Sequence, residues 1–214
     1  MKNVKEMMLL YAVTDRTWLK DETLYQQVEK ALKGGVTCIQ LREKRQDESE
    51  FLKEAHEIHE LCQTYSVPFI INDNVNIAIA CQADGVHIGQ DDMSCQKARQ
   101  LIGDDMILGV SCQTVEQAIQ AQKDGADYLG VGAVFPTDTK SDAIEVNHQT
   151  LKDICQSVDI PVVAIGGINK QNILELKGTD VDGVALVSAI FAANDIQSEC
   201  QELKQLSMEM IQYD

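Results

Sequence analysis

Short apolar runs recur along the chain at regular intervals, and polar or glycine residues follow nearly every run. Most of the runs do not alternate strictly between apolar and polar positions, which is typical of parallel strands buried on both faces. We therefore predict eight parallel strands. The runs are "MLLYAVT" (8–14), "VTCIQLR" (36–42), "VPFIIND" (67–73), "DGVHIG" (84–89), "MILGVS" (106–111), "DYLGVG" (127–132), "PVVAIGG" (161–167) and "DGVALVS" (182–188).

Most segments between these runs have helical spacing. Segment 23–35 places Leu24, Val28 and Leu32 on one face and ends at a glycine pair, which is a helix stop signal. Segment 47–65 has the same pattern, and a further helix is expected to begin after Thr114 as its N-terminal cap.

Eight strands alternating with helices predict a single-domain α/β fold, a (β/α)8 TIM barrel over residues 1–214. An open, doubly wound sheet is the alternative. However, its nucleotide-binding glycine fingerprint is missing from the first turn, "AVTDRTWL".

The composition fits one soluble globular domain, with 44% hydrophobic and 24% charged residues. No apolar run reaches the roughly 18 residues needed to cross a bilayer, and the N-terminus lacks the features of a signal peptide. We expect a cytoplasmic protein without membrane contacts. The seven cysteines form no CxxC pair, so buried thiols in a reducing compartment are expected.

The net charge of −16 argues against nucleic acid as a partner, because that binding needs a basic face. An anionic substrate would be repelled at long range, so its site must supply local cations. The sequence leaves open whether the chain forms a homo-oligomer.

In a barrel of this kind the active site lies at the carboxyl ends of the strands. After the second run, alternation directs Gln40 and Arg42 into the barrel, with Lys44 just beyond. Arg42 and Lys44 are then two cations on one wall, suited to phosphate oxygens. A solvated loop of alternating charge is the alternative, and it is favoured for Glu43 and Arg45.

The third and fourth runs end in "IINDN" and "IGQDD", which brings Asn72, Asp73 and Asp92 toward the barrel mouth. Oxygen ligands without nearby histidine or cysteine suit Mg²⁺, which often shares a substrate phosphate. Helix capping is the alternative role for Asp73, and it is favoured for Asp91.

The seventh and eighth runs end in Gly166-Gly167 and Ser188, which can form a phosphate cup from backbone N–H groups. A glycine turn followed by a helix cap is the alternative. The "PTDTK" loop (136–140) lies between the two anion-binding regions in chain order. We interpret it as a lid that joins two phosphorylated substrates through Thr137, Thr139 and Lys140.

Two histidine patterns remain. His56 and His59 are three residues apart rather than the four that a zinc-binding helix uses, so a solvated helix face is expected. His87 lies within the fourth run and is left without a role. We also find no Cys-His or Ser-His-Asp arrangement that would supply a nucleophile.

Seven motifs in order resemble the thiamine phosphate synthase family over nearly the whole chain. They are "QLREK" (40–44), "NDN" (72–74), "DGVHIGQDD" (84–92), "GVS" (109–111), "GVGAVFPTDTK" (130–140), "AIGGI" (164–168) and "VSAI" (187–190). One departure is "SCQT" after the fifth run, where many relatives have Ala-His in the middle.

The resemblance implies a Mg²⁺-dependent transferase of thiamine biosynthesis. It would couple hydroxymethylpyrimidine diphosphate with a thiazole phosphate and release diphosphate. By the same resemblance, three groups of residues acquire roles. The pyrimidine diphosphate is held by Gln40, Leu41, Arg42, Glu43, Lys44, Asn72, Ser111 and Lys140; the metal by Asp73 and Asp92; and the thiazole phosphate by Thr137, Asp138, Thr139, Gly167, Val187 and Ser188.

We expect Arg42, Lys44, Lys140 and Ser111 to serve catalysis by neutralising and positioning charge. Two rival functions remain. One is a thiazole tautomerase of the same superfamily, which needs no residues that bind a diphosphate. The other is a non-catalytic thiamine-phosphate binding protein.

Overall fold

The eight apolar runs form eight short parallel strands in the computed structural model of the protein, which describes residues 3–19, 21–137 and 145–211. The strands close into a barrel, because β1 pairs with both β2 and β8. The predicted (β/α)8 barrel is therefore confirmed, and the open sheet is wrong. The strands are β1 Leu10–Val13, β2 Cys38–Leu41, β3 Phe69–Asn72, β4 Gly85–Ile88, β5 Ile107–Cys112, β6 Tyr128–Val131, β7 Val162–Ile165 and β8 Gly183–Leu186.

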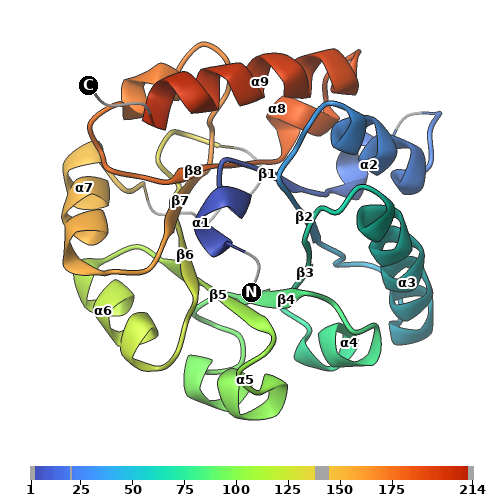
Figure 1. Cartoon of the computed structure of the whole chain (residues 1–214), viewed down its shortest axis with the longest axis horizontal. Coiled ribbons are helices and arrows are strands. Elements are labelled where there is room, and N and C mark those ends of the chain that lie inside the picture. Colours follow the sequence, from blue (N-terminus) through green and yellow to red (C-terminus); the bar gives the residue numbers. More distant parts are fainter. Residues whose placement is uncertain (1–2, 20, 138–144, 212–214) are drawn as a thin grey trace.

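A ring of helices surrounds the barrel (Figure 1). Between β7 and β8 the chain makes only a short 3₁₀ helix, η2, and the long α9 packs against both η2 and α2. The helical elements are α1 Val4–Met7, η1 Arg16–Trp18, α2 Leu24–Lys33, α3 Glu48–Thr64, α4 Val75–Ala80, α5 Cys95–Ile102, α6 Val115–Lys123, α7 His148–Ser157, η2 Ile173–Leu176, α8 Ser188–Phe191 and α9 Ile196–Ile211.

The helix signals in the sequence act as expected. Leu24, Val28 and Leu32 form part of the buried face of α2, which ends where Gly34 begins the stop. The Thr114 hydroxyl accepts a hydrogen bond from the backbone N–H of Gln117 at 3.2 Å, which caps α6. These local signals fix where the helices begin and end around the barrel.

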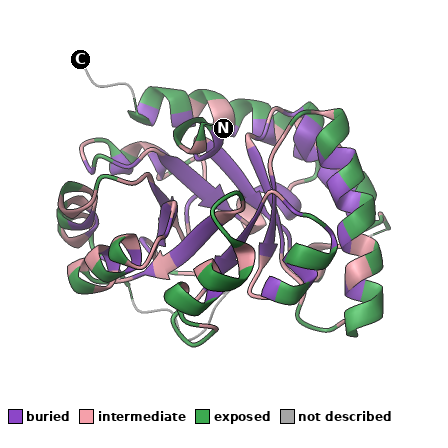
Figure 2. Ribbon diagram, turned by 60° about the horizontal axis from the view of Figure 1, so that its bottom comes forward, coloured by how far each residue is buried: buried purple, intermediate pink, exposed green. Residues whose placement is uncertain are grey.

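The core has two layers, because successive strand residues point to opposite faces. The larger layer lies between the barrel and the helices, and Figure 2 shows the strands as almost entirely buried. The smaller layer fills the barrel interior with side chains that include Tyr11, Ile70 and Tyr128. At its amino end, Met7 and Met8 join this interior cluster, and α1 lies across the barrel centre in Figure 1.

Helix α3 corrects one prediction. His56 is exposed as expected, but His59 is only 8% exposed and stacks on Phe69 with ring centroids 5.3 Å apart. Its Nδ1 lies 3.1 Å from the backbone oxygen of Cys81. The expectation of a solvated face is therefore wrong for His59, because its position on α3 turns the ring toward β3.

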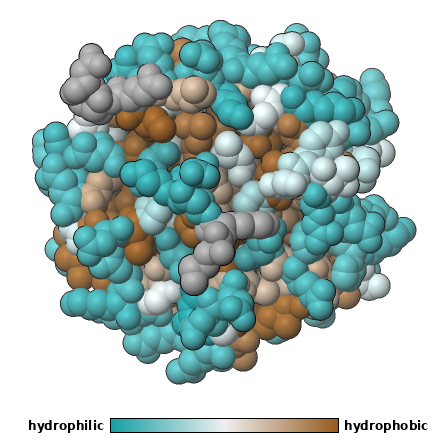
Figure 3. Space-filling view, viewed as in Figure 1, coloured by the Kyte–Doolittle hydropathy of each residue, from teal (hydrophilic) through white to brown (hydrophobic). Residues whose placement is uncertain are grey.

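Two further expectations concern the surface and the thiols. Five of the seven cysteines are buried, in agreement with the prediction. Hydrophilic side chains cover most of the face seen in Figure 3, with scattered hydrophobic patches toward its middle. Within the described ranges, the helices are too short or too polar to span a bilayer.

Candidate functional site

A cavity of about 630 Å³ opens at the carboxyl ends of β2, β3 and β4. Its wall combines three of the predicted diphosphate residues with the two predicted metal ligands. The lining residues that matter here are Glu43, Lys44, Asn72, Asp73 and Asp92. Asp91 does not line the cavity, so the two adjacent aspartates occupy different surroundings.

Arg42 is held at the rim by β1. Its backbone N–H donates to the Thr14 hydroxyl at 3.0 Å, and its guanidinium Nη1 donates to Asp15 at 2.7 Å. Partial burial raises the pKa of Asp15, but hydrogen bonds from Thr17 and the charge of Arg42 outweigh this and lower it. Asp15 is thus a fixed carboxylate that orients Arg42 toward the mouth.

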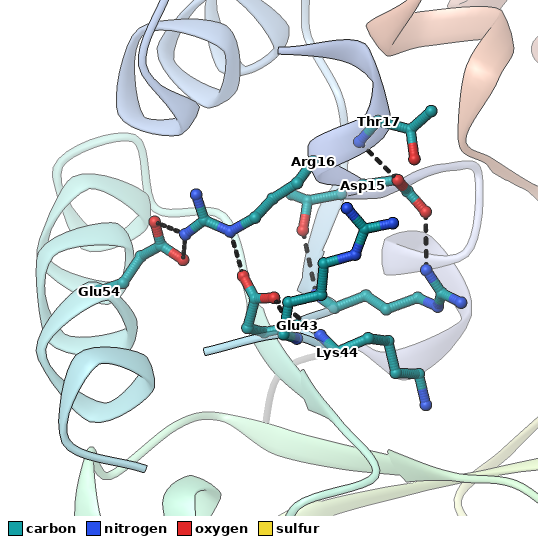
Figure 4. Close-up of polar contacts among 9 residues, drawn as sticks. Asp15, Arg16, Thr17, Glu43, Lys44 and Glu54 are labelled. Carbon is teal, nitrogen blue, oxygen red and sulfur yellow. Dashed lines mark hydrogen bonds and ion pairs between the residues drawn. The ribbon is translucent and has the colours of Figure 1, made fainter. Parts of the chain in front are cut away.

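Glu43 clamps the loop after β2 (Figure 4). One of its oxygens accepts the backbone N–H groups of Lys44 at 2.8 Å and of Arg45 at 2.9 Å, and the other accepts from Arg16. Nη2 of Arg16 also donates to both carboxylate oxygens of Glu54 on α3, at 2.6 and 2.7 Å. The Glu43 carboxylate is therefore engaged on both oxygens, and only its backbone remains for the predicted diphosphate contact.

Lys44 and Asp73 form an ion pair across the cavity. Asp73 has a left-handed backbone with φ of 63°, a conformation that costs about 1 kcal/mol or more for a residue with a side chain. Its N–H donates to the backbone oxygen of His87 at 2.7 Å, which keeps the turn in place. Strain of this kind is often found where a side chain must point into a site.

Asp92 lies on the neighbouring loop and accepts the Gly89 backbone N–H at 2.7 Å. Burial raises the pKa of Asp92, the Gly89 hydrogen bond lowers it, and the neighbouring Asp73 carboxyl raises it again. The pKa of Asp92 is therefore higher than usual, as expected for two carboxyl groups that share a site. In the described part of the chain no third carboxylate, histidine or cysteine completes a metal cluster.

Gln40 and Ser111 lie deeper, at the top of the barrel interior. Gln40 is 4% exposed and donates from Nε2 to the Tyr11 hydroxyl at 2.8 Å. Ser111 Oγ lies 2.9 Å from His87 Nε2. A Ser-His pair is thus present, although its partner on Nδ1 is Tyr128 at 3.0 Å rather than a carboxylate.

This pair does not resemble an activated nucleophile. Burial lowers the pKa of His87 to about 4, which makes its ring a weak base. The expectation that no Ser-His-Asp triad exists is therefore retained for the described residues, but the prediction missed the pair itself.

The next predicted residues are Leu41, Gly167 and those of the loop after Thr137. Leu41 is fully buried in the outer core, so its side chain faces the helices and only its backbone can reach a ligand. Gly167 has φ of 66°, and a Cβ there would lie 2.4 Å from the Pro136 backbone oxygen. The loops after β6 and β7 therefore touch, as a shared phosphate cup requires. Asp138, Thr139 and Lys140 lie outside the described residues.

Val187 and Ser188 follow β8 directly. Ser188 begins the four-residue helix α8, while the last long helix, α9, starts only at Ile196. Thr137 is the last described residue of its loop before residue 145 and is partly buried.

Asp15 and Arg16 were missed by the sequence reasoning. Both follow β1, and "TDR" at the end of a predicted strand was a usable signal for groups at the barrel mouth. Their partners lie 27 to 38 residues away along the chain, so only the closed barrel brings them together.

The comparisons with known proteins place this geometry in a family. Residues 10–190 match the family described as thiamine monophosphate synthase. The chain belongs to the thiamine monophosphate synthase family. The family expected from the motifs is thereby confirmed, and with it the prediction of a transferase of thiamine biosynthesis.

Relatives in this family match over most of their length. Thiamine-phosphate synthase from Clostridium tetani is 50% identical over 91% of this chain and 93% of its own. The protein of the same name from Methanobrevibacter smithii is 50% identical over 87% and 88%. The solved thiamine phosphate pyrophosphorylase from Pyrococcus furiosus is 39% identical, with a TM-score of 0.91 over 98% of this chain and 100% of that structure.

Proposed function

We propose that the protein couples 4-amino-2-methyl-5-hydroxymethylpyrimidine diphosphate with 4-methyl-5-(2-phosphooxyethyl)thiazole, giving thiamine phosphate and diphosphate. The observation that carries this proposal is the cavity in which Lys44, Asp73 and Asp92 converge. Arg42 follows the same strand, two residues before Lys44, and pairs with Asp15. Cations beside paired carboxylates are suited to a diphosphate accompanied by a divalent metal. The family match supplies the substrates.

Asp73 and Asp92 fit Mg²⁺ as carboxylate ligands from adjacent loops. Both are hard oxygen donors. Burial and then the neighbouring Asp73 raise the pKa of Asp92, and a cation would offset both effects. Two protein ligands leave positions for water and for phosphate oxygens, as is usual for Mg²⁺. When bound, Mg²⁺ would supply positive charge to the departing diphosphate.

The protein residues then bind and orient the reactants. Arg42, held by Asp15, can grip diphosphate oxygens, and Lys44 can move from Asp73 onto the same group. Ser111 and Gln40 would face the pyrimidine, and Asn72 the metal corner. We assign Lys140, from the loop beyond Thr137, to the diphosphate as well.

In the reaction, the bond between the pyrimidine methylene carbon and the diphosphate oxygen breaks, and its electron pair leaves with diphosphate. The electron-rich aminopyrimidine stabilises the resulting cation. The thiazole nitrogen then donates its lone pair to form the new carbon–nitrogen bond. No protein nucleophile is needed, which agrees with the weak basicity of His87.

The second substrate would be held on the opposite side of the mouth. Gly167, Val187 and Ser188 offer backbone N–H groups and one hydroxyl to its phosphate. Thr137, Asp138 and Thr139 would close over it. We propose that one domain over residues 1–214 carries both halves of this site.

The rival functions predict different chemistry. A thiazole tautomerase would not need Lys44 and the aspartate pair in one cavity, and a non-catalytic binding protein would not need two metal-binding carboxylates. The decisive test mixes the purified protein with both substrates and Mg²⁺ and measures thiamine phosphate by fluorescence after oxidation.

We expect product and released diphosphate in equal amounts, with both lost on omission of Mg²⁺. Folded protein that yields neither would overturn the proposed function. Arg42→Ala serves as the matched control with reduced activity, and Arg45→Ala, whose side chain is exposed, as the fully active one.

A further inference from the structure

A continuous chain of hydrogen bonds crosses the barrel interior beneath the proposed site. Gln40 Nε2 donates to the Tyr11 hydroxyl at 2.8 Å, and that hydroxyl lies 2.8 Å from the Tyr128 hydroxyl. Tyr128 in turn lies 3.0 Å from His87 Nδ1, and His87 Nε2 lies 2.9 Å from Ser111 Oγ. The chain therefore joins Gln40 on β2 to Ser111 on β5 through the two tyrosines and His87.

Two glycines make room for this chain. A Cβ on Gly109 would lie 2.2 Å from Cζ of Tyr128 and 2.5 Å from His87 Nδ1. A Cβ on Gly130 would lie 3.0 Å from the His87 ring. His87, Gly109 and Tyr128 are paired in register on β4, β5 and β6, so the two rings fill the space above a missing side chain.

The position of each hydrogen in this hydrogen-bond chain follows from which atoms can donate. The amide nitrogen of Gln40 can only donate, so Tyr11 accepts there and donates its own hydrogen to Tyr128. Tyr128 then donates to His87 Nδ1, which leaves the ring hydrogen on Nε2. His87 Nε2–H donates to Ser111 Oγ, and every buried hydroxyl hydrogen within the chain has an acceptor.

This order leaves two groups at the barrel mouth. Ser111 accepts from His87, so its own hydrogen is available to a ligand. Gln40 donates one of its two amide hydrogens to Tyr11, which fixes the orientation of the amide group and leaves its carbonyl oxygen able to accept from a ligand. Burial of His87, which keeps its pKa low and its ring neutral, is consistent with one donor and one acceptor nitrogen.

We propose that Tyr11, Tyr128 and His87 are positioning residues that fix Ser111 as a hydrogen-bond donor and Gln40 as an acceptor toward the substrate. The substrate part of this inference rests on the proposed function. It requires a ring with a donor group near Gln40 and an acceptor near Ser111, which an aminopyrimidine provides. The two ends are coupled, because reversing one reverses every hydrogen between them.

The coupling can be tested without substrate by ¹⁵N NMR of the histidine rings at pH 7.5, with the His87 signals assigned from His87→Gln. In the unmodified protein we expect the hydrogen on Nε2. In Gln40→Glu the carboxylate can only accept, so Tyr11 must donate to it, and the hydrogen should move to Nδ1. In Gln40→Glu combined with Tyr11→Phe the chain is interrupted, and Gln40→Glu should no longer set the position of the hydrogen.

Hydrogen on Nδ1 in the unmodified protein would overturn the proposal, as would a His87 ring that does not respond to Gln40→Glu. Because this measurement needs no substrate, it separates the two proposals. A protein with the expected ring response but no synthase activity would overturn the proposed function alone, while an active protein without that response would overturn the hydrogen-bond chain.

A kinetic cycle tests the same inference when Gln40→Glu does not fold. Tyr128→Phe keeps the ring and removes the hydroxyl, and it should lower kcat/KM for the pyrimidine diphosphate by about 2- to 10-fold. In a Ser111→Ala background the same change should have no effect, because its influence runs through the Ser111 hydroxyl. An equal loss in both backgrounds would show a merely structural role and refute the assignment.

Discussion

His87 should make the stability of the fold depend on pH. The ring is buried in the barrel, where burial lowers its pKa from 6.5 to about 4. In the unfolded chain the ring takes up a proton near pH 6.5, while in the folded chain it stays neutral. Its contribution to stability is therefore complete above pH 6.5 and is lost as the pH falls toward 4.

The size of the effect follows from the gap between the two pKa values. Each unit corresponds to about 1.4 kcal/mol, so the full loss is about 3 kcal/mol. Between pH 7.5 and pH 5 the loss from this one ring should be about 2 kcal/mol. This is a large share of the roughly 5–15 kcal/mol that stabilises a typical protein.

Urea unfolding at pH 7.5 and at pH 5 measures this loss. Carboxylates also titrate in this range, so the informative quantity is the difference between the unmodified protein and His87→Gln. The variant should be less stable at pH 7.5 but should lose about 2 kcal/mol less on acidification. His56→Gln is the matched control, because it makes the same substitution at an exposed position on α3, outside the barrel interior.

Parallel losses in His87→Gln and the unmodified protein would refute this reasoning. NMR gives a second check, because the His87 ring should remain neutral at pH 5.5 in the folded protein. A His87 ring protonated at pH 5.5 in the folded protein would mean that burial does not control its charge.

Four further predictions follow from the site. Arg42→Ala should lower kcat/KM for the pyrimidine diphosphate by roughly 10- to 200-fold at saturating Mg²⁺, because it removes a charge-assisted hydrogen bond. Lys140→Ala is expected to have an effect of the same size, and unchanged kinetics in either variant would contradict the role of that residue. Asp15→Asn should cost about 5-fold by loosening Arg42, since a partly exposed ion pair contributes about 1 kcal/mol, and an unaltered KM and kcat would exclude it as a positioning group. Asp73→Asn should raise the Mg²⁺ concentration for half-maximal activity roughly tenfold or more, and a titration that matches the unmodified enzyme would remove Asp73 from the metal site. Gly109→Ala should destabilise the fold by about 1–3 kcal/mol in urea unfolding, because its Cβ meets Tyr128 and His87; full stability would mean that the rings can move aside.

Local patterns were sufficient to predict the barrel. Apolar runs and stop signals depend on neighbours a few residues apart, so the strands and most helices could be read directly. Alternation along β2 correctly placed Gln40 inward and Leu41 outward. The sequence therefore also predicted which loops lie at the carboxyl end of the barrel.

Contacts across the barrel could not be predicted in this way. The pairing of Asp15 with Arg42 and of Arg16 with Glu43 depends on which strands are neighbours and on their register. His59 was misjudged for a related reason, since only the packing of α3 on β3 decides on which side of the helix it lies. Tyr11 and Tyr128 were not singled out in the sequence and His87 was left without a role, because their heights inside the barrel come from the strand registers.

The methionines at the amino end of the barrel have a consequence for proton exchange. Met7 and Met8 close that end, being 3% and 0% exposed. Among the described residues, this leaves the opposite opening, past Gln40 or Ser111, as the side from which water can approach the interior hydroxyls of Tyr11 and Tyr128. A substrate bound beside Gln40 and Ser111 would block this opening. Deuterium from the solvent should therefore exchange into the two tyrosine hydroxyls more slowly when the site is occupied.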